Sequence, residues 1–125
     1  MNRKVVAAAW IALFMGLMGD FLAAQERITA PGAKLEKLGG DFSFTEGPAA
    51  DRKGNVYFTD QPNDRIMKWS TAGQLSVFLQ PSGRSNGLCF DRKGNLWACA
   101  DEKNAIWIIG ADKNITVLLK DYQGK

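Results

Sequence analysis

Two stretches of the chain, EGPAADRKGNVY at residues 46–57 and NGLCFDRKGNLW at residues 86–97, are copies of one pattern. Both contain the run Asp-Arg-Lys-Gly-Asn, and the two runs lie forty residues apart. The correspondence continues without a gap, since Ile66 meets Ile106, Val77 meets Val117 and Leu79 meets Leu119. A fixed period of this length is the signature of a protein built from structural repeats.

Each copy of the repeat predicts four short strands. Turn residues separate segments rich in β-branched and aromatic side chains, and the segment 65–69 alternates polar and apolar residues as a half-buried strand does. Four antiparallel strands in about forty residues match one blade of a β-propeller. We therefore predict an all-β fold with about two four-stranded blades. The predicted strands cover residues 47–50, 56–59, 65–69, 74–79, 95–99, 105–109 and 115–119.

Two other architectures fit parts of the pattern. A β-sandwich or a small barrel would explain the alternation, but not so regular a period. A solenoid would explain the period, but its repeats are usually shorter or helical.

The first 24 residues have the layout of a secretory signal peptide. A basic start at residues 2–4 precedes an apolar run at 5–18, and small residues follow at 23–24. The run is shorter than the ~20 residues that a membrane-spanning helix needs. We expect cleavage near Ala24, a secreted or periplasmic location, and no stable membrane span afterwards. An uncleaved anchor or a buried core helix is the alternative.

The predicted organisation after the signal peptide (1–24) has three parts. An N-terminal segment (25–45) carries one strand at 33–38, a first blade occupies 46–85, and a second blade occupies 86–125. A propeller ring needs about four to eight blades. We therefore expect the chain to be a truncated part of a larger propeller. If it is instead a complete product, its open apolar faces predict aggregation or assembly.

The composition excludes several kinds of chemistry. The chain contains no histidine, so it cannot form a Ser-His-Asp triad, a histidine general base or an imidazole zinc site by itself. The 16 basic and 13 acidic residues are scattered along the sequence, which gives no indication of nucleic-acid binding.

Several other residues receive structural interpretations. Residues 83–87 match the pattern G-x-S-x-G, but a strand follows Ser85 and no histidine exists, so we interpret Ser85 as a loop residue. Cys89 is expected to face Trp97, with Cys99 diagonal to it, which favours two buried thiols over a disulfide. Asp60 and Asp101 are interpreted as turn residues. Trp69, Trp97 and Trp107 are expected to pack in the core and between blades.

Glu46 and Asn86 are the candidate functional residues. They occupy the same position in the two copies, at the start of the predicted inner strand. The ends of inner strands point toward the mouth of a propeller's central channel, where a carboxylate can bind a hard cation through oxygen. Asn86 offers an amide oxygen or an amide donor to the same opening. The alternative is that both are polar residues that cap strand ends.

The residues FTEGPAAD (44–51), GNVYFTD (54–60), PSG (81–83) and SNGL (85–88) carry a resemblance to a known family. From about Gly39 onward the chain resembles the N-terminal part of the gluconolactonase, regucalcin (senescence marker protein) and luciferin-regenerating enzyme family. The resemblance implies a six-bladed propeller with a divalent metal in its channel, most often calcium, with zinc, manganese or magnesium as alternatives. It also implies a lactone substrate.

By the family pattern, Glu46 matches the metal ligand of the first blade. Asn86 has no firm ligand counterpart in the family and is a candidate substrate-pocket residue only. The remaining ligands and the acid/base Asp come from later blades, so no catalytic residue is assigned in this chain. The expected function is metal-dependent opening of a sugar lactone by an activated water, and the fragment alone is expected to be inactive. The alternative is a non-catalytic propeller of the NHL or YWTD kind that acts as an extracytoplasmic binding platform.

Overall fold

The computed structural model describes residues 30–121, 123 and 124. The chain divides into two units, Met1–Leu38 and Gly39–Lys125, and the sheets belong to the second. The predicted signal peptide lies outside the described residues. Within the described part, no helix has the length and apolar character needed to cross a bilayer.

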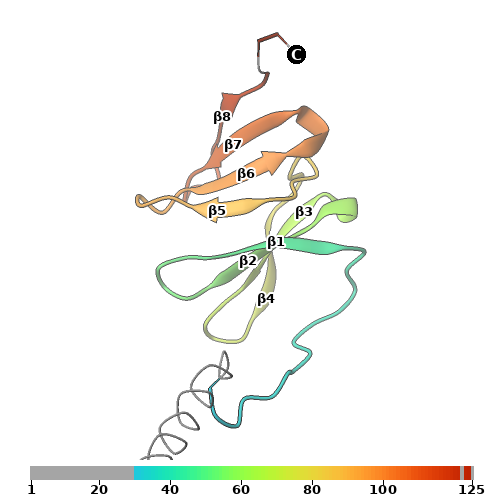
Figure 1. The fold of residues 1–125 in the computed structure, drawn as a ribbon, viewed down its shortest axis with the longest axis vertical. Helices are drawn as coiled ribbons and strands as arrows, with labels where there is room; N and C mark the ends of the chain where they lie inside the picture. Colours follow the sequence, from blue (N-terminus) through green and yellow to red (C-terminus); the bar gives the residue numbers. More distant parts are fainter. Residues whose placement is uncertain (1–29, 122, 125) are drawn as a thin grey trace, which may run out of the picture. The chain divides into compact units, whose positions relative to one another are not determined.

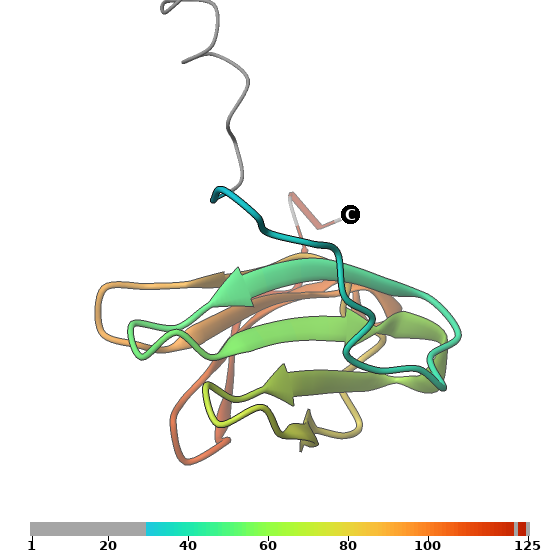
Figure 2. The same cartoon turned by 90° about the horizontal axis from the view of Figure 1, so that it is seen from below.

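Two four-stranded antiparallel sheets make up the second unit (Figure 1). Each sheet has its strands in chain order, so that each strand pairs with the next one (Figure 2). A short 3₁₀ turn follows the second strand of each sheet, at η1 (Gln61–Asn63) and η2 (Asp101–Lys103). The first sheet contains β1 (Thr45–Ala50), β2 (Val56–Asp60), β3 (Arg65–Trp69) and β4 (Leu75–Leu79), and the second contains β5 (Leu88–Phe90), β6 (Leu96–Ala100), β7 (Ala105–Ile109) and β8 (Ile115–Leu119).

The predicted all-β fold with two four-stranded repeats is confirmed, and each sheet corresponds to one copy of the forty-residue repeat. The predicted bounds of β3, β7 and β8 agree with the structure. The other predicted bounds differ from the observed ones by one or two residues, where the ends of the ladders depend on pairing rather than on side-chain type.

The identical Asp-Arg-Lys-Gly-Asn runs form identical turns. Asp51 Oδ1 accepts hydrogen bonds from the backbone N–H groups of Lys53 and Asn55, and Asp51 Oδ2 accepts one from Asn55 Nδ2. Asp91 makes the same three contacts in the second sheet. Gly54 and Gly94 take positive φ angles of 86° and 88°, which glycine adopts without a steric penalty.

The apolar core lies between the two sheets. Tyr57 and Ile66 from the first sheet pack with Leu96, Ala98 and Ile109 from the second, and all five are buried. Burial of this apolar surface is the main force that holds the sheets together.

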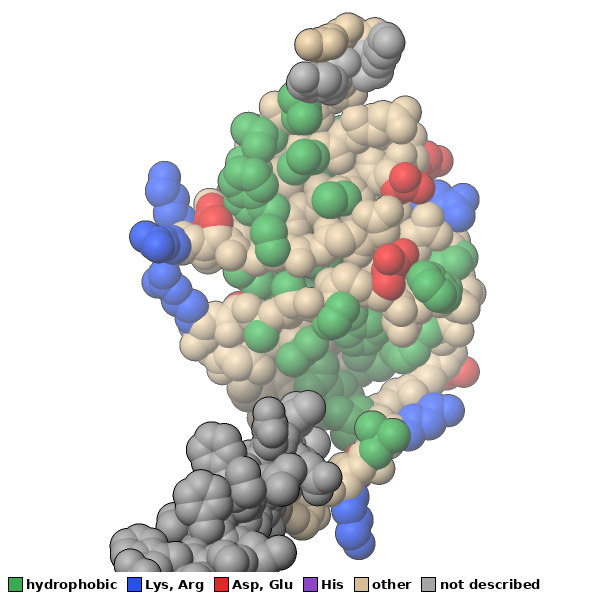
Figure 3. All heavy atoms as spheres, viewed as in Figure 1, with side chains coloured by type: hydrophobic (Ala, Val, Ile, Leu, Met, Phe, Trp, Pro, Cys, Tyr) green, Lys and Arg blue, Asp and Glu red, His purple; other side chains and the backbone are tan. Residues whose placement is uncertain are grey.

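The face that the first sheet buries in this contact is not the repeat equivalent of the face that the second sheet buries. Tyr57, Thr59 and Ile66 of the first sheet face the second sheet. Their repeat equivalents, Trp97, Cys99 and Ile106, lie on the other face of the second sheet, because Leu96, Ala98 and Ala100 of β6 are the residues that turn toward the core. Surface hydrophobic side chains are visible in Figure 3. Those of the outer strands include Leu75, Val77, Ile115, Val117, Leu118 and Leu119.

Two structural predictions are corrected. The segment 33–38 is predicted to form a strand, but it has no regular secondary structure and its side chains are exposed. A strand needs a partner for its backbone hydrogen bonds, and none is paired with this segment in the described part of the chain. Cys89 does pair with Trp97 as predicted, and both cysteines are free thiols, but the prediction that they are buried is wrong, since both are exposed.

The exposed cysteines give a direct test of the open face of the second sheet. We expect Cys89 and Cys99 both to react with Ellman's reagent in the native chain, because a thiol reacts when its thiolate is accessible to the reagent. The measurement is the number of thiols titrated with and without denaturant. Titration of both thiols only after denaturation would contradict the exposed positions.

Candidate functional site at the start of the inner strands

Glu46 is the second residue of β1, and its side chain is half-buried. The pairing of β1 with β2 is irregular between Glu46 and Ala49. Gly47, with a φ of 57°, and Pro48 occupy this irregular part. A positive φ and a residue without an N–H donor both interrupt a regular ladder, so this stretch forms a bulge next to Glu46.

The structure brings the backbones of Glu46 and Asn86 together. The buried Thr59 hydroxyl lies 3.0 Å from the carbonyl oxygen of Glu46 and 3.3 Å from that of Asn86, and donates toward both. A Cβ on Gly47 would overlap the Asn86 carbonyl oxygen, so the close approach depends on glycine at this position. The inner strands β1 and β5 are in contact. The prediction that Glu46 and Asn86 occupy one region is therefore confirmed, while their functional roles stay predictions.

The side chains of Glu46 and Asn86 differ in which polar atoms remain available to a ligand. Asn86 Oδ1 accepts a hydrogen bond of 2.6 Å from the Gly87 N–H. Among the hydrogen bonds and ion pairs of the described residues, none involves the Glu46 carboxylate or Asn86 Nδ2. The site thus presents a free carboxylate from Glu46 and an amide donor from Asn86.

Glu46 alone supplies only part of a cation site. Calcium takes about six to eight oxygen ligands, and within residues 30–121, 123 and 124 no group of three His, Cys, Asp or Glu side chains could hold a metal. The free, half-buried carboxylate of Glu46 is a suitable ligand for a divalent metal, but it is only one ligand. A complete calcium site would need further oxygen ligands besides Glu46.

The sequence interpretation missed a set of oxygen-bearing side chains near Asn86. Together with Asn86, they line a cavity of about 320 Å³ at the η2 end of the second sheet. Asp101 begins η2, Asn104 follows it, and Asp121 lies after β8. These positions between strands carry no periodic signal. The polar residues that line the cavity besides Asn86 are Asp101, Asn104 and Asp121.

Asp60 is not the simple turn residue that the sequence predicts. Its carboxylate is fully buried and forms an ion pair of 2.7 Å with Arg65. It also accepts hydrogen bonds from Asn63 Nδ2 and from the N–H groups of Ser43 and Phe44. Asp60 therefore fixes the segment that enters β1 and leads to Glu46. Asp101, by contrast, is exposed at the start of η2, as expected of a turn residue.

Asp64 holds the segment that leads to Asn86, as Asp60 holds the segment that leads to Glu46. Its Oδ1 accepts hydrogen bonds from the N–H and hydroxyl groups of Ser82 and from the N–H of Arg84. Ser85 lies in the same loop, where its buried hydroxyl donates to the Ser82 carbonyl oxygen at 2.5 Å. The interpretation of Ser85 as a loop residue is confirmed.

The two sheets and their adjacent inner strands define the chain as a pair of β-propeller blades. No protein-family model matches the chain. A curated gluconolactonase from Zymomonas mobilis is 25% identical over 126 residues, which cover 89% of this chain and 35% of that protein.

Solved structures agree with this match. One candidate gluconolactonase is 30% identical with a TM-score of 0.71 over 77% of this chain and 34% of its own. A gluconolactonase from Xanthomonas campestris is 27% identical with a TM-score of 0.67 over 70% of this chain and 30% of its own. A calcium-binding protein, regucalcin from Agrobacterium tumefaciens, shares the fold at 22% identity and a TM-score of 0.57, over 66% of this chain and 32% of its own. The resemblance to the gluconolactonase and regucalcin family is thereby confirmed as a partial match. The chain spans about a third of the length of these relatives.

Proposed function

We propose that this chain is part of a divalent-metal-dependent sugar lactonase, in which Glu46 binds the metal and Asn86 contacts the substrate. The observation that carries the proposal is the free, half-buried carboxylate of Glu46 in β1, whose backbone carbonyl shares the Thr59 hydroxyl with that of Asn86, just before β5. The names of the gluconolactonase relatives support the substrate class, a small lactone. The calcium-binding neighbour supports calcium as the metal, with zinc, manganese and magnesium as the alternatives.

The chemistry divides between the metal and the protein. A bound divalent cation would polarise the lactone carbonyl and lower the pKa of a coordinated water. Glu46 would neutralise part of the cation's charge, and Asn86 Nδ2 would donate a hydrogen bond to a substrate oxygen. Thr59, through its contact with both backbone carbonyls, would keep these two residues in register.

We propose that residues 1–24 are a signal peptide that directs the protein to the periplasm or the exterior. We assign no catalytic residue to the chain and propose that it is inactive alone, because the family resemblance assigns Glu46 to the metal and takes the acid/base Asp from a later blade.

A calcium titration tests the role of Glu46. Removing the negative charge in Glu46→Gln is expected to weaken calcium binding by at least about tenfold, because calcium sites depend on the number of charged ligands. Isothermal titration calorimetry of the chain, and of the longest product of the gene that contains it, would measure this. Glu36→Gln, which removes an exposed carboxylate from the other unit, is the control. Equal calcium affinities for Glu46→Gln and the unsubstituted protein would remove Glu46 from the site.

Hydrolysis of glucono-δ-lactone tests the activity. The longest gene product is expected to hydrolyse the lactone in a reaction that a chelator stops, and the 125-residue chain is expected to give only the spontaneous rate. Metal-dependent turnover by the chain alone would refute its proposed inactivity. Lactone binding without turnover by the longest product would favour the binding platform over the enzyme.

A further inference from the structure

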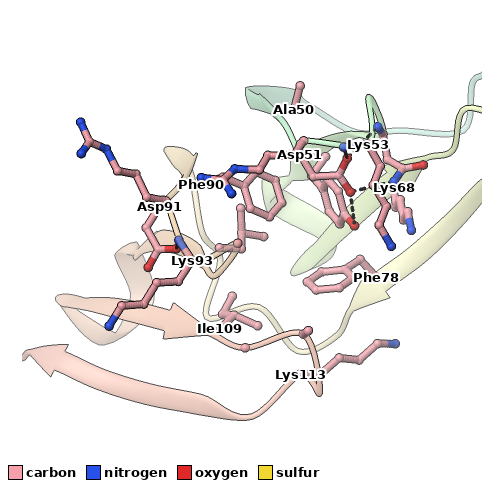
Figure 4. Close-up of a pocket in the computed structure, with 18 of the residues that line it drawn as sticks. Ala50, Asp51, Lys53, Lys68, Phe78, Phe90, Asp91, Lys93, Ile109 and Lys113 are labelled. Atoms are coloured by element: carbon pink, nitrogen blue, oxygen red, sulfur yellow. Dashed lines mark hydrogen bonds between the residues drawn. The ribbon is translucent and has the colours of Figure 1, made fainter.

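A groove of about 970 Å³ lies between the two sheets, at the ends of β1 and β5 opposite to Glu46 and Asn86. The two Asp-Arg-Lys-Gly-Asn turns, forty residues apart in the sequence, both line it. Figure 4 shows the groove, with Lys53 and Lys68 on the side of the first sheet and Lys93 on the side of the second. This volume is within the range of pockets that hold small molecules.

The floor of the groove is apolar and includes a cluster of aromatic rings. Tyr57 makes edge-to-face contacts with Phe78 and with Phe90, each with ring centroids 5.0 Å apart. Leu96 and Ile109, both buried, complete the floor from the second sheet. A ligand with an apolar body would bury its surface against the half-buried Phe78 and Phe90 rings, which pack on the buried Tyr57. Removal of this apolar surface from water favours binding.

The rim of the groove is basic. Two of its lysines are held over aromatic rings: Lys68 Nζ lies 5.5 Å from the centroid of Tyr57, and Lys113 Nζ lies 5.5 Å from that of Phe78. Cation–π contacts of this kind keep the ammonium groups near the apolar floor. The basic residues that line the groove are Arg52, Lys53, Lys68, Arg92, Lys93 and Lys113.

The two carboxylates of the groove point into their own turns. Burial raises the pKa of Asp51, but hydrogen bonds from Asn55 and Lys53 outweigh this effect and place the pKa below its usual value. The side chain of Asn95, followed by its backbone and by Trp97 and Lys93, lowers the pKa of Asp91 to about 2 despite opposing desolvation. Within the described residues, neither of the two ion pairs includes a basic residue of the groove. With six basic and two acidic residues, the groove carries a net positive charge.

We propose that this groove binds a small organic anion with an apolar, aromatic-sized body and a carboxylate or phosphate head. The body contacts the half-buried Phe78 and Phe90 rings, and the head accepts hydrogen bonds from Lys68 and Lys113. The proposal rests on the packing of the two sheets and is independent of the lactonase chemistry at the other end of the strands. A groove shared by the two turns would let a ligand bridge the two sheets and stabilise their contact.

The experiment uses the full chain and four probes with one body: 2-naphthoate, 2-naphthyl phosphate, neutral 2-naphthalenemethanol and cationic 2-naphthylmethylammonium. We expect the two anions to bind more tightly than the neutral and cationic probes in calorimetric titrations. Their affinities should fall as NaCl is raised, because salt screens exposed charges. The ratio of the two anion affinities distinguishes a carboxylate ligand from a phosphate ligand.

The variant Lys68→Gln with Lys113→Gln is expected to weaken binding of the anions by roughly fivefold, the size expected from removing two partly exposed charge pairs. Lys103→Gln with Lys120→Gln removes the same charge outside the groove and is expected to change nothing. Far-ultraviolet circular dichroism verifies that both variants keep their sheets. Equal affinity for the cationic probe, or equal losses in the two double variants, would overturn the proposal. Binding of a short single-stranded oligonucleotide without binding of either naphthyl anion would also overturn it, and would indicate a polyanion surface.

Discussion

Gly47→Ala is expected to destabilise the chain by more than about 3 kcal/mol. Its φ of 57° already costs an alanine roughly 1–2 kcal/mol. The added Cβ would in addition overlap the backbone carbonyl oxygen of Asn86, which cannot move as a flexible side chain does. To relieve the overlap, β1 would have to move away from β5. The Thr59 hydroxyl could then no longer donate toward the carbonyl oxygens of both Glu46 and Asn86. Urea unfolding followed by tryptophan fluorescence measures the loss.

Gly94→Ala separates the steric effect from the backbone effect. Gly94 also has a positive φ, 88°, but no heavy atom lies within 4 Å of the position that an added Cβ would occupy. This variant is expected to lose only about 1–2 kcal/mol, the cost of the backbone conformation. Equal losses in Gly47→Ala and Gly94→Ala would show that β1 and β5 do not need their close approach.

Asp60→Asn is expected to destabilise the chain by roughly 3 kcal/mol, because it leaves a partly buried Arg65 without its counter-ion. In either orientation, the amide NH2 would face existing donors, which are Asn63 and Arg65 on one side and the N–H groups of Ser43 and Phe44 on the other. Asp101→Asn, at an exposed position in η2, is the control and is expected to change stability by less than about 0.5 kcal/mol. Urea unfolding near pH 7 measures both variants, and similar stability of the two would contradict the anchoring role of Asp60.

The stability effect of Asp60→Asn is expected to depend on pH. Burial raises the pKa of Asp60, but hydrogen bonds from Asn63, Arg65, Ser43 and Phe44 outweigh it and place the pKa below its usual value of 3.8. A carboxyl whose pKa is lower in the folded state stabilises the fold above the unfolded pKa and loses this effect as the pH falls through the folded pKa. We therefore expect Asp60→Asn to lose less stability than the unsubstituted chain as the pH falls below about 4.

The repeat predicts the location of the candidate site well. Aligning the two copies places Glu46 and Asn86 at equivalent positions, and the structure holds their backbones against the same Thr59 hydroxyl. This succeeds because strand register within a repeat follows from the turn sequence and the alternation of side chains. The anchoring role of Asp60 could not be predicted in this way. Its equivalent in the second copy is Ala100, and its partners Ser43 and Phe44 precede the repeat.

Burial cannot be predicted from the repeat either. Thr59 and Cys99 are equivalent residues, yet Thr59 is fully buried and Cys99 is exposed. The difference arises because the face that carries Thr59 packs on the second sheet, while the equivalent face with Cys99 has no neighbouring sheet in the described part of the chain. Equivalent local structure therefore does not imply equivalent packing.

The local structure could be predicted from the amino-acid sequence: two Asp-Arg-Lys-Gly-Asn turns and the four strands around each of them. These follow from short-range hydrogen bonds and from side-chain alternation, which a linear sequence specifies. What the two turns form together depends on how the sheets pack. The basic residues that are scattered along the chain gather around one apolar groove, because burial of Tyr57, Ile66, Leu96 and Ile109 sets the sheets face to face and brings both turns to the same end.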